Sequence, residues 1–289
     1  MVAETTIAVA EFWLGTTDPG VGKATSVAFS LSGSSIVATV PLAGIALGAQ
    51  RFNLRVKDSA GNWSNAVNTT VTLTRANAIF SSGFSSATSP FGWFSSTGGP
   101  SVTAAAGIPF GGTNLGLQVT LPGGATNGPR YLTDTTPSAE TSYHASFAFN
   151  ANTLTSGTNA GSVLTLFDAQ TAAAGQVLAV QFHRTLGVGA VNQIRMVFPR
   201  STGTYTGPWV TLPTGSHTLR VDWLAGPATG ANPGSLRLVL DGVSVDFQTG
   251  NTGTRTVETA RLGLVSGVTN SMAGTAYFDS FASTRYTLP

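Results

Sequence analysis

The stretch LRLVLDGVSVDF, residues 236–247, decides the fold class of this chain. Apolar and polar residues alternate on both sides of the pair Asp241–Gly242. An Asp-Gly pair between alternating runs is among the strongest short-range signals for a β-hairpin with a two-residue turn. A second stretch, SYHASFAFN, alternates in the same way and sets Tyr143, Phe147 and Phe149 on one face. Both patterns predict antiparallel strands with one buried face.

The same kind of pattern extends over the whole chain. Short runs rich in β-branched and aromatic residues are separated by Gly, Pro, Asn, Asp and Ser, and a helical period is hard to find. At 289 residues the chain is long enough for two cores. We therefore predict an all-β protein, with a small immunoglobulin-like sandwich over residues 1–75 and a larger jelly roll over residues 76–289.

Charged residues are scarce, and this narrows the function. The chain has 14 basic and 12 acidic residues, or 9% charged, against about a quarter in ordinary soluble proteins. The net charge is only +2 and no run of Lys or Arg occurs, so nucleic acid is not an expected partner. No stretch approaches the ~18 apolar residues of a membrane helix, so membrane insertion is not expected. The absence of Cys favours a bacterial chain, or one that is stable without disulfides.

Two segments of the first domain resemble a bacterial Ig-like repeat. AEFWLGTTDPGVGKAT (residues 10–25) is similar to the opening hairpin of that family, and RFNLRVKDSAGNWS (residues 51–64) is similar to its closing strand and turn. The resemblance implies a spacer or adhesion module of a surface protein. Alternation in FNLRV predicts that Phe52, Leu54 and Val56 form the buried face of a strand.

The second domain resembles the concanavalin A-like, or laminin-G-like, jelly-roll modules of bacterial surface proteins. The resemblance covers residues 78–285 and depends on YLTDTTPSAETSYHASFAFN (131–150), GSHTLRVDW (215–223) and YFDSFASTR (277–285), with LFDAQ and QFHR between them. It implies binding of a sugar, glycan or protein, or a spacer role, because the fold alone does not fix the function.

Such modules often bind Ca²⁺, a hard ion that takes 6–8 oxygen ligands. Asp279 in YFDSF matches the position of a terminal acid in these families, so the resemblance makes it a calcium candidate. The partner acid expected in the opening strand is missing, because that strand has the sequence IFSSGFSS. The alternative role for Asp279 is a hydrogen bond at the end of its strand.

The common catalytic constellations are not found. Some concanavalin A-like folds are glucanases with an E-x-D-x-x-E strand, since glycoside cleavage needs two flanking carboxylates, and that spacing does not occur here. Cys and the GxSxG motif are missing. His144, His183 and His217 fall in separate predicted strands and lack zinc-site spacing. We therefore expect no enzymatic activity.

A sugar-binding site needs exposed aromatic rings beside hydrogen-bonding side chains. The stretch RSTGTYTGPW offers Tyr205 and Trp209 in a Gly/Thr-rich loop, with Arg200 nearby, and these three are the candidate ligand-binding residues. The alternative is that these rings pack in the core, since a Trp that leads into a strand often does so.

These patterns predict a non-enzymatic extracellular module of a bacterial surface or secreted protein that serves adhesion or carbohydrate recognition. The first alternative is a structural subunit or spacer of a surface filament or array, and the remote alternative is a glycan-active hydrolase. Expected partners are a glycan or a surface protein. Only two Lys are present to protect sheet edges, so self-association through edges is a further expectation, with residues 5–10 as a donated segment. We interpret Met1 as the start of an excised fragment that lacks its export signal.

Overall fold

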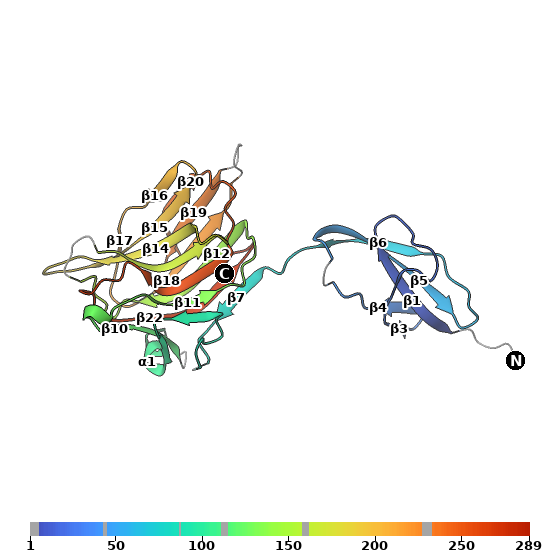
Figure 1. Cartoon of the computed structure of the whole chain (residues 1–289), viewed down its shortest axis with the longest axis horizontal. Coiled ribbons are helices and arrows are strands. Elements are labelled where there is room, and N and C mark those ends of the chain that lie inside the picture. The colour runs from blue at the N-terminus through green and yellow to red at the C-terminus, as the bar shows by residue number, and fades with distance from the viewer. Residues whose placement is uncertain (1–5, 43–44, 87, 111–114, 158–161, 227–232) are drawn as a thin grey trace. The chain divides into compact units, whose positions relative to one another are not determined.

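The computed structural model of the chain is shown in Figure 1 and describes residues 6–42, 45–86, 88–110, 115–157, 162–226 and 233–289. The chain divides into two compact units, Met1–Ala76 and Asn77–Pro289. The described residues form 22 strands and three short helices, α1 (Ala104–Gly107), η1 (Ile108–Phe110) and η2 (Gly124–Thr126). None of the helices in the described ranges is long and apolar enough to span a membrane. The predicted all-β fold class is confirmed.

Unit 1 contains a four-stranded antiparallel sheet, in the order β2-β1-β5-β6, and a separate two-stranded hairpin, β3–β4. Its strands are β1 (Ile7–Leu14), β2 (Thr25–Ser26), β3 (Phe29–Ser32), β4 (Ser35–Ala38), β5 (Gly48–Asp58) and β6 (Val67–Leu73). The predicted donor segment 5–10 begins outside the described residues. From Ile7 onward it pairs with β5 of its own unit. The resemblance of this unit to an Ig-like repeat stays a prediction.

The two faces of β5 are buried in the opposite order to our expectation. Phe52, Leu54 and Val56 do share a face, but each is only half-buried, whereas Asn53 and Arg55 on the other face are 5% and 4% exposed. The prediction that the apolar face is the more deeply buried one was therefore wrong. The cause is the loop between β1 and β2. Asp18 and the backbone carbonyl of Gly20, both in this loop, accept hydrogen bonds from Arg55 and cover it.

Arg55 is the centre of unit 1. Its Nε donates to Glu11 Oε1, and its Nη1 donates to both oxygens of Asp18, at 2.9 and 3.0 Å. Its guanidinium carbon lies 4.6 Å from the ring centroid of Trp13 and 5.7 Å from that of Trp63. Burial opposes the charged form of Arg55, but the hydrogen bonds and charges of Glu11 and Asp18 raise its pKa. Arg55 and Glu11 thus form a buried ion pair, which the more exposed Asp18 extends to the surface.

Unit 2 is a sandwich of two eight-stranded antiparallel sheets. The first has the order β20-β19-β18-β12-β22-β10-β9, with β7 also paired to β22. The second has the order β16-β15-β14-β13-β21-β11-β8, with β17 also paired to β15. The strands of the first sheet are β7 (Ala78–Ser82), β9 (Ser101–Thr103), β10 (Gly116–Leu121), β12 (Ser142–Asn150), β18 (Ser216–Leu224), β19 (Gly234–Leu240), β20 (Val243–Gly250) and β22 (Gly274–Thr284). Those of the second are β8 (Ser95–Thr97), β11 (Arg130–Asp134), β13 (Leu164–Gln170), β14 (Gln176–Arg184), β15 (Asn192–Arg200), β16 (Gly203–Thr206), β17 (Val210–Leu212) and β21 (Thr259–Ser266).

The predicted local patterns of unit 2 are confirmed. β19 and β20 form a hairpin, and its turn residues Asp241 and Gly242 have φ values of 49° and 82°, in the left-handed region that a two-residue turn of this kind needs. In β12 every second side chain, from Tyr143 to Phe149, is buried. Rings from the two sheets meet between them, with the centroid of Phe147 lying 5.4 Å from that of Phe167. These contacts form a single core between the sheets.

The two ends of unit 2 are tied together. β7, the first strand, pairs with the last part of β22. The side-chain oxygen of Asn77 accepts hydrogen bonds from the backbone N–H groups of Tyr286 and Thr287, at 2.8 and 3.0 Å. Arg285 donates to both carboxylate oxygens of Glu140, each at 2.9 Å. The point where the chain enters the unit therefore lies beside the point where the last strand ends.

One acid is buried without a charged partner. Asp134, at the end of β11, is 2% exposed, and its Oδ1 accepts the backbone N–H of Thr136 at 2.8 Å. Its Oδ2 is buried and makes no hydrogen bond. Burial raises the pKa of Asp134, and the hydrogen bond from Thr136 only partly opposes this.

Arg55→Ala is expected to destabilise unit 1 by about 3–5 kcal/mol, because Glu11 is left buried and unpaired. Denaturant unfolding followed by tryptophan fluorescence measures this, since Trp13 and Trp63 lie against Arg55. Arg51→Ala, at an exposed position of the same strand, is the matched control and should stay within about 0.5 kcal/mol of the parent. Equal transition midpoints for the two variants would contradict the central role of Arg55.

Asp134→Asn is expected to stabilise unit 2 at pH 7 and to have little effect at pH 3. The folded state binds the Asp134 proton more tightly than the unfolded state, so this group adds stability below its ordinary pKa and the contribution is lost as the pH rises through the raised value. Thermal unfolding of both proteins across this pH range measures the difference. A melting temperature lowered by the substitution at pH 7 would refute the assignment.

Candidate functional site

The second sheet of unit 2 carries polar side chains on its outer face. In β14 and β15 the core-facing residues Val180, Phe182, Ile194 and Met196 are fully buried. The residues between them point away from the core. They include Gln181, His183 and Arg195.

Trp209 lies on this outer face. It directly precedes β17, is half-buried, and does not belong to the hydrophobic core of the sandwich. The guanidinium carbon of Arg195 lies 4.2 Å from its ring centroid, and the ring of His183 lies 5.3 Å from it, centroid to centroid. Arg195 Nε donates to Gln181 Oε1 at 2.8 Å. We call Gln181, His183, Arg195 and Trp209 the Trp209 cluster.

Arg195 is held in place without an acidic partner. Among the described residues it makes no ion pair, and its terminal nitrogens make no hydrogen bond. The hydrogen bond from its Nε to Gln181 and the contact with the Trp209 ring fix the side chain. Burial lowers the pKa of Arg195. By contrast, Arg261 on the same face makes two hydrogen bonds to Asp168, at 2.8 and 2.5 Å, which raise its pKa. Arg195 therefore presents free donors next to an aromatic ring.

A second arginine–aromatic pair lies farther along the same face. The guanidinium carbon of Arg261 is 5.2 Å from the ring centroid of Tyr131 on β11. The strands β11, β21, β13, β14 and β15 are consecutive neighbours in the sheet. Four interstrand spacings of ~4.8 Å place the two pairs on strands roughly 19 Å apart. The outer face thus has aromatic groups and hydrogen-bonding groups over the length of a short oligosaccharide.

Of the three residues predicted to bind ligand, Arg200 and Tyr205 contact each other, whereas the ring of Trp209 contacts Arg195 and His183. Tyr205, on β16, packs against the core, and its hydroxyl lies 3.3 and 3.4 Å from the carboxylate oxygens of Asp246 on β20, so that it links the two sheets. Burial raises the pKa of Asp246. The guanidinium carbon of Arg200 lies 5.8 Å from the Tyr205 ring. Tyr205 therefore packs against the core, as the alternative interpretation expected. Trp209 lies on the outer face, where it contacts Arg195 and His183.

Asp279, the calcium candidate, is fully buried on β22, where its Oδ1 accepts the backbone N–H of Ser280 at 2.6 Å. Ser280 has a φ of 50°, at a register shift between β12 and β22. Within the described ranges no three His, Cys, Asp or Glu side chains gather as a metal site. The calcium role therefore stays a prediction, and a hydrogen bond at the irregular part of the strand is what is observed.

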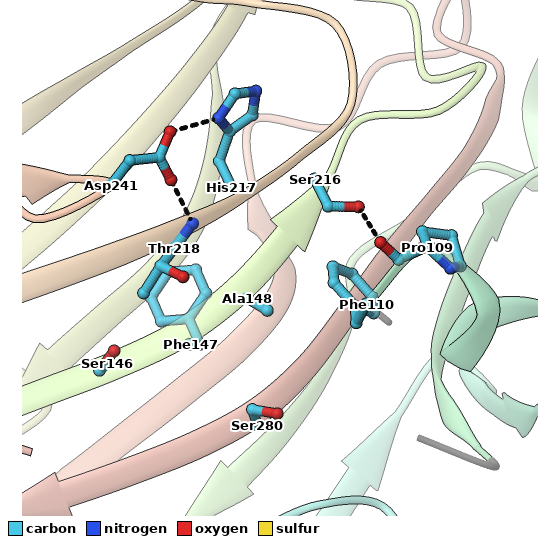
Figure 2. A pocket seen from close by; sticks show the side chains of 10 residues that line it. All are labelled: Pro109, Phe110, Ser146, Phe147, Ala148, Ser216, His217, Thr218, Asp241 and Ser280. Atoms are coloured by element: carbon cyan, nitrogen blue, oxygen red, sulfur yellow. Dashed lines mark hydrogen bonds and ion pairs between the residues drawn. The ribbon is translucent and has the colours of Figure 1, made fainter. Parts of the chain in front are cut away.

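A pocket of about 400 Å³ lies on the outer side of the first sheet (Figure 2). On one wall, His217 Nδ1 lies 2.7 Å from Asp241 Oδ2, and His217 Nε2 lies 3.0 Å from the carbonyl of Pro213. Ser216 donates to the carbonyl of Pro109 at 2.7 Å. Partial burial opposes ionisation of Asp241, but hydrogen bonds from His217 and Thr218 lower its pKa. Since both ring nitrogens of His217 are occupied, it does not complete a Ser-His-Asp triad with Ser216.

Comparison with known proteins finds solved structures that align with this chain at low sequence identity. No family model matches the chain, and no curated protein matches it. The receptor-binding domain of botulinum neurotoxin type G aligns with a TM-score of 0.46 at 10% identity, over 74% of this chain and 49% of that one. The cellulose-induced protein Cip1 aligns with a TM-score of 0.48 at 13% identity, over 72% and 97%. The alginate lyase AlyC3 aligns with a TM-score of 0.42 at 10% identity, over 58% and 74%. This chain matches about half the length of the neurotoxin domain, and no function follows from these likenesses.

Sequence reasoning missed Gln181 and Arg195 as members of the candidate site. A signal for them was present, because each falls on the polar side of an alternating strand whose other side is apolar. Their proximity to Trp209 depends on the pairing of β14, β15 and β17, which the sequence of a single strand does not reveal.

Tyr205→Phe is expected to cost about 1 kcal/mol of stability in unit 2, because Asp246 loses a hydrogen bond between the sheets. Tyr286→Phe removes the hydroxyl of an exposed tyrosine and is the matched control, expected within about 0.5 kcal/mol of the parent. Calorimetric unfolding measures both variants. If the two lost equal stability, the link between β16 and β20 would not be energetically significant.

Proposed function

We propose that unit 2 recognises carbohydrate on the outer face of its second sheet, at the Trp209 cluster. The observation that carries the proposal is the position of Trp209, which lies outside the core against an arginine without an acidic partner. An aromatic ring offers a flat apolar surface to the C–H groups of a pyranose. The adjacent donors satisfy hydroxyl or carboxylate oxygens of the sugar, and a few such polar groups fix its orientation.

The cluster is suited to binding because it is already in place. Arg195 is held between Trp209 and Gln181, so little side-chain entropy is lost when a ligand accepts a hydrogen bond from its terminal nitrogens. The ring of His183 is fixed by a hydrogen bond between its Nδ1 and the carbonyl of Ser162, at 2.9 Å. Several copies of such a site acting together would gain affinity through multivalency.

In this proposal the protein is a non-enzymatic binding module that acts outside the cell, on the surface of a bacterium or in a secreted protein. Support comes from the scarcity of ionisable residues and from the chemistry of the outer face. Acid–base catalysis requires a titratable group within reach of the substrate. Asp168, the acid of this face, is already paired with Arg261. Adhesion to a glycan-bearing surface is the role that follows from the proposal.

Trp209→Ala is expected to abolish binding on a glycan array that includes neutral and acidic oligosaccharides, because the sugar loses its stacking surface. Arg195→Ala should weaken binding at least tenfold, which corresponds to about 1.4 kcal/mol. Tyr286→Ala removes an exposed aromatic ring elsewhere in unit 2 and should bind like the parent. Binding that survives Trp209→Ala, or an array without signal for the parent, would refute the proposal.

A further inference from the structure

Strand β6 is an open edge of unit 1. Within the described residues it is hydrogen-bonded to β5 alone, at the end of the sheet order β2-β1-β5-β6 (Figure 1). Its residues are exposed from Val67 through Thr72. The pairing with β5 runs without a register shift from Gly48↔Leu73 to Leu54↔Val67. β6 therefore presents a regular row of unpaired backbone groups.

This edge lacks the features that usually prevent pairing between molecules. Natural edge strands are protected by charges, by proline, by bulges or by being very short. No charged residue and no proline occurs between Asp58 and Arg75, and β6 is seven residues long. The opposite edge, β2, is only two residues long and is protected by its length. The sheet thus has one edge that can accept a further strand.

The sequence of β6 is complementary to itself in the antiparallel direction. With two copies of VNTTVTL paired about Thr70, Val67 lies opposite Leu73, Thr69 lies opposite Val71, and each Thr70 lies opposite the other. Directly opposed residues of an antiparallel pair share a face of the sheet. Val67, Val71 and Leu73 therefore meet on one face together with Thr69, and the other face is polar throughout.

The apolar face of this pairing continues an exposed apolar surface. Val67 and Thr69 lie on the same face as Leu54 and Phe52, with which they pair. A groove of about 370 Å³ on this face is lined by residues of β1, β4, β5 and β6, among them Phe12 and Ile36. Val67 and Val71 are 64% and 42% exposed. A second β6 would bring its own Leu73 and Val71 beside these residues and reduce their exposure.

From these observations we infer that unit 1 forms a homodimer by antiparallel pairing of β6 with β6 of a second copy, about a two-fold axis at Thr70. The neutral edge lets two identical copies approach without charge repulsion. An isologous contact of this kind closes at two molecules, because both copies use the same edge, β6, which is then occupied. Pairing of a single seven-residue strand is smaller than a standard interface, so the dimer is weak and depends on concentration.

Sedimentation equilibrium of the full chain tests this inference. The average mass of the parent should rise with concentration from 29.5 kDa toward twice that value. Thr70→Lys should weaken dimerisation at least tenfold, since like charges directly opposite each other are destabilising. Thr70→Glu should do the same. An equimolar mixture of the two variants should dimerise again, because opposite charges then meet across the axis.

Val21→Lys is the matched control, since it places the same charge at an exposed valine of unit 1 outside β6. It should dimerise like the parent. A parent that remains monomeric at millimolar concentration would overturn the inference, as would dimerisation that persists in a folded Thr70→Lys variant. Restored association in the mixture supports the register centred on Thr70, and its failure refutes that register. Glycan binding by unit 2 does not enter this experiment.

Discussion

The packing of the two sheets of unit 2 against each other is the constraint on which the rest of that unit depends. Alternate side chains of β12 (Tyr143, Ala145, Phe147 and Phe149) and the rings of Phe278 and Phe281 on β22 are buried in the core between the sheets. The rings of Phe149 and Phe182 meet across them with centroids 5.8 Å apart. With both inner faces filled, the surfaces that are open to a ligand are the outer faces and the loops. This is why a tryptophan outside the core carries more functional information than the buried ones.

Several of the scarce charged residues hold identifiable positions in the fold. In unit 1, Arg55 stabilises a polar face that alternation alone would have assigned to solvent. In unit 2, Arg261 and Arg285 each bind one acid, Asp168 and Glu140. Buried charges are costly unless they are paired, so such pairs serve to fix loops and strand ends as much as to stabilise the fold. Arg195 is one of several arginines that make no ion pair within the described residues, and its distinguishing contact is with the ring of Trp209.

Sequence patterns predicted the parts of the structure that are local. The Asp241–Gly242 turn and the alternation of β12 needed only neighbouring residues, because hairpin turns and strand faces follow from backbone geometry. The face of β5 was assigned wrongly, since a period of two distinguishes two faces but not which of them a distant loop will cover. Trp209 was recognised as a candidate, whereas Arg195 was not. Their contact is produced by strand pairing between residues well separated in sequence.

The link between the two ends of unit 2 has a mechanical consequence. The chain enters β7 next to the place where β22 ends, and these strands are antiparallel. Tension applied between the start of β7 and the end of β22 would pull on the two strands at the same end of their pairing. The β7–β22 hydrogen bonds would then break one after another in an unzipping geometry, and not all together in shear. The pair would yield at low force, and β7 would peel away before the rings between the sheets separate. A unit built in this way would lengthen a stretched chain early while its two packed sheets are still folded.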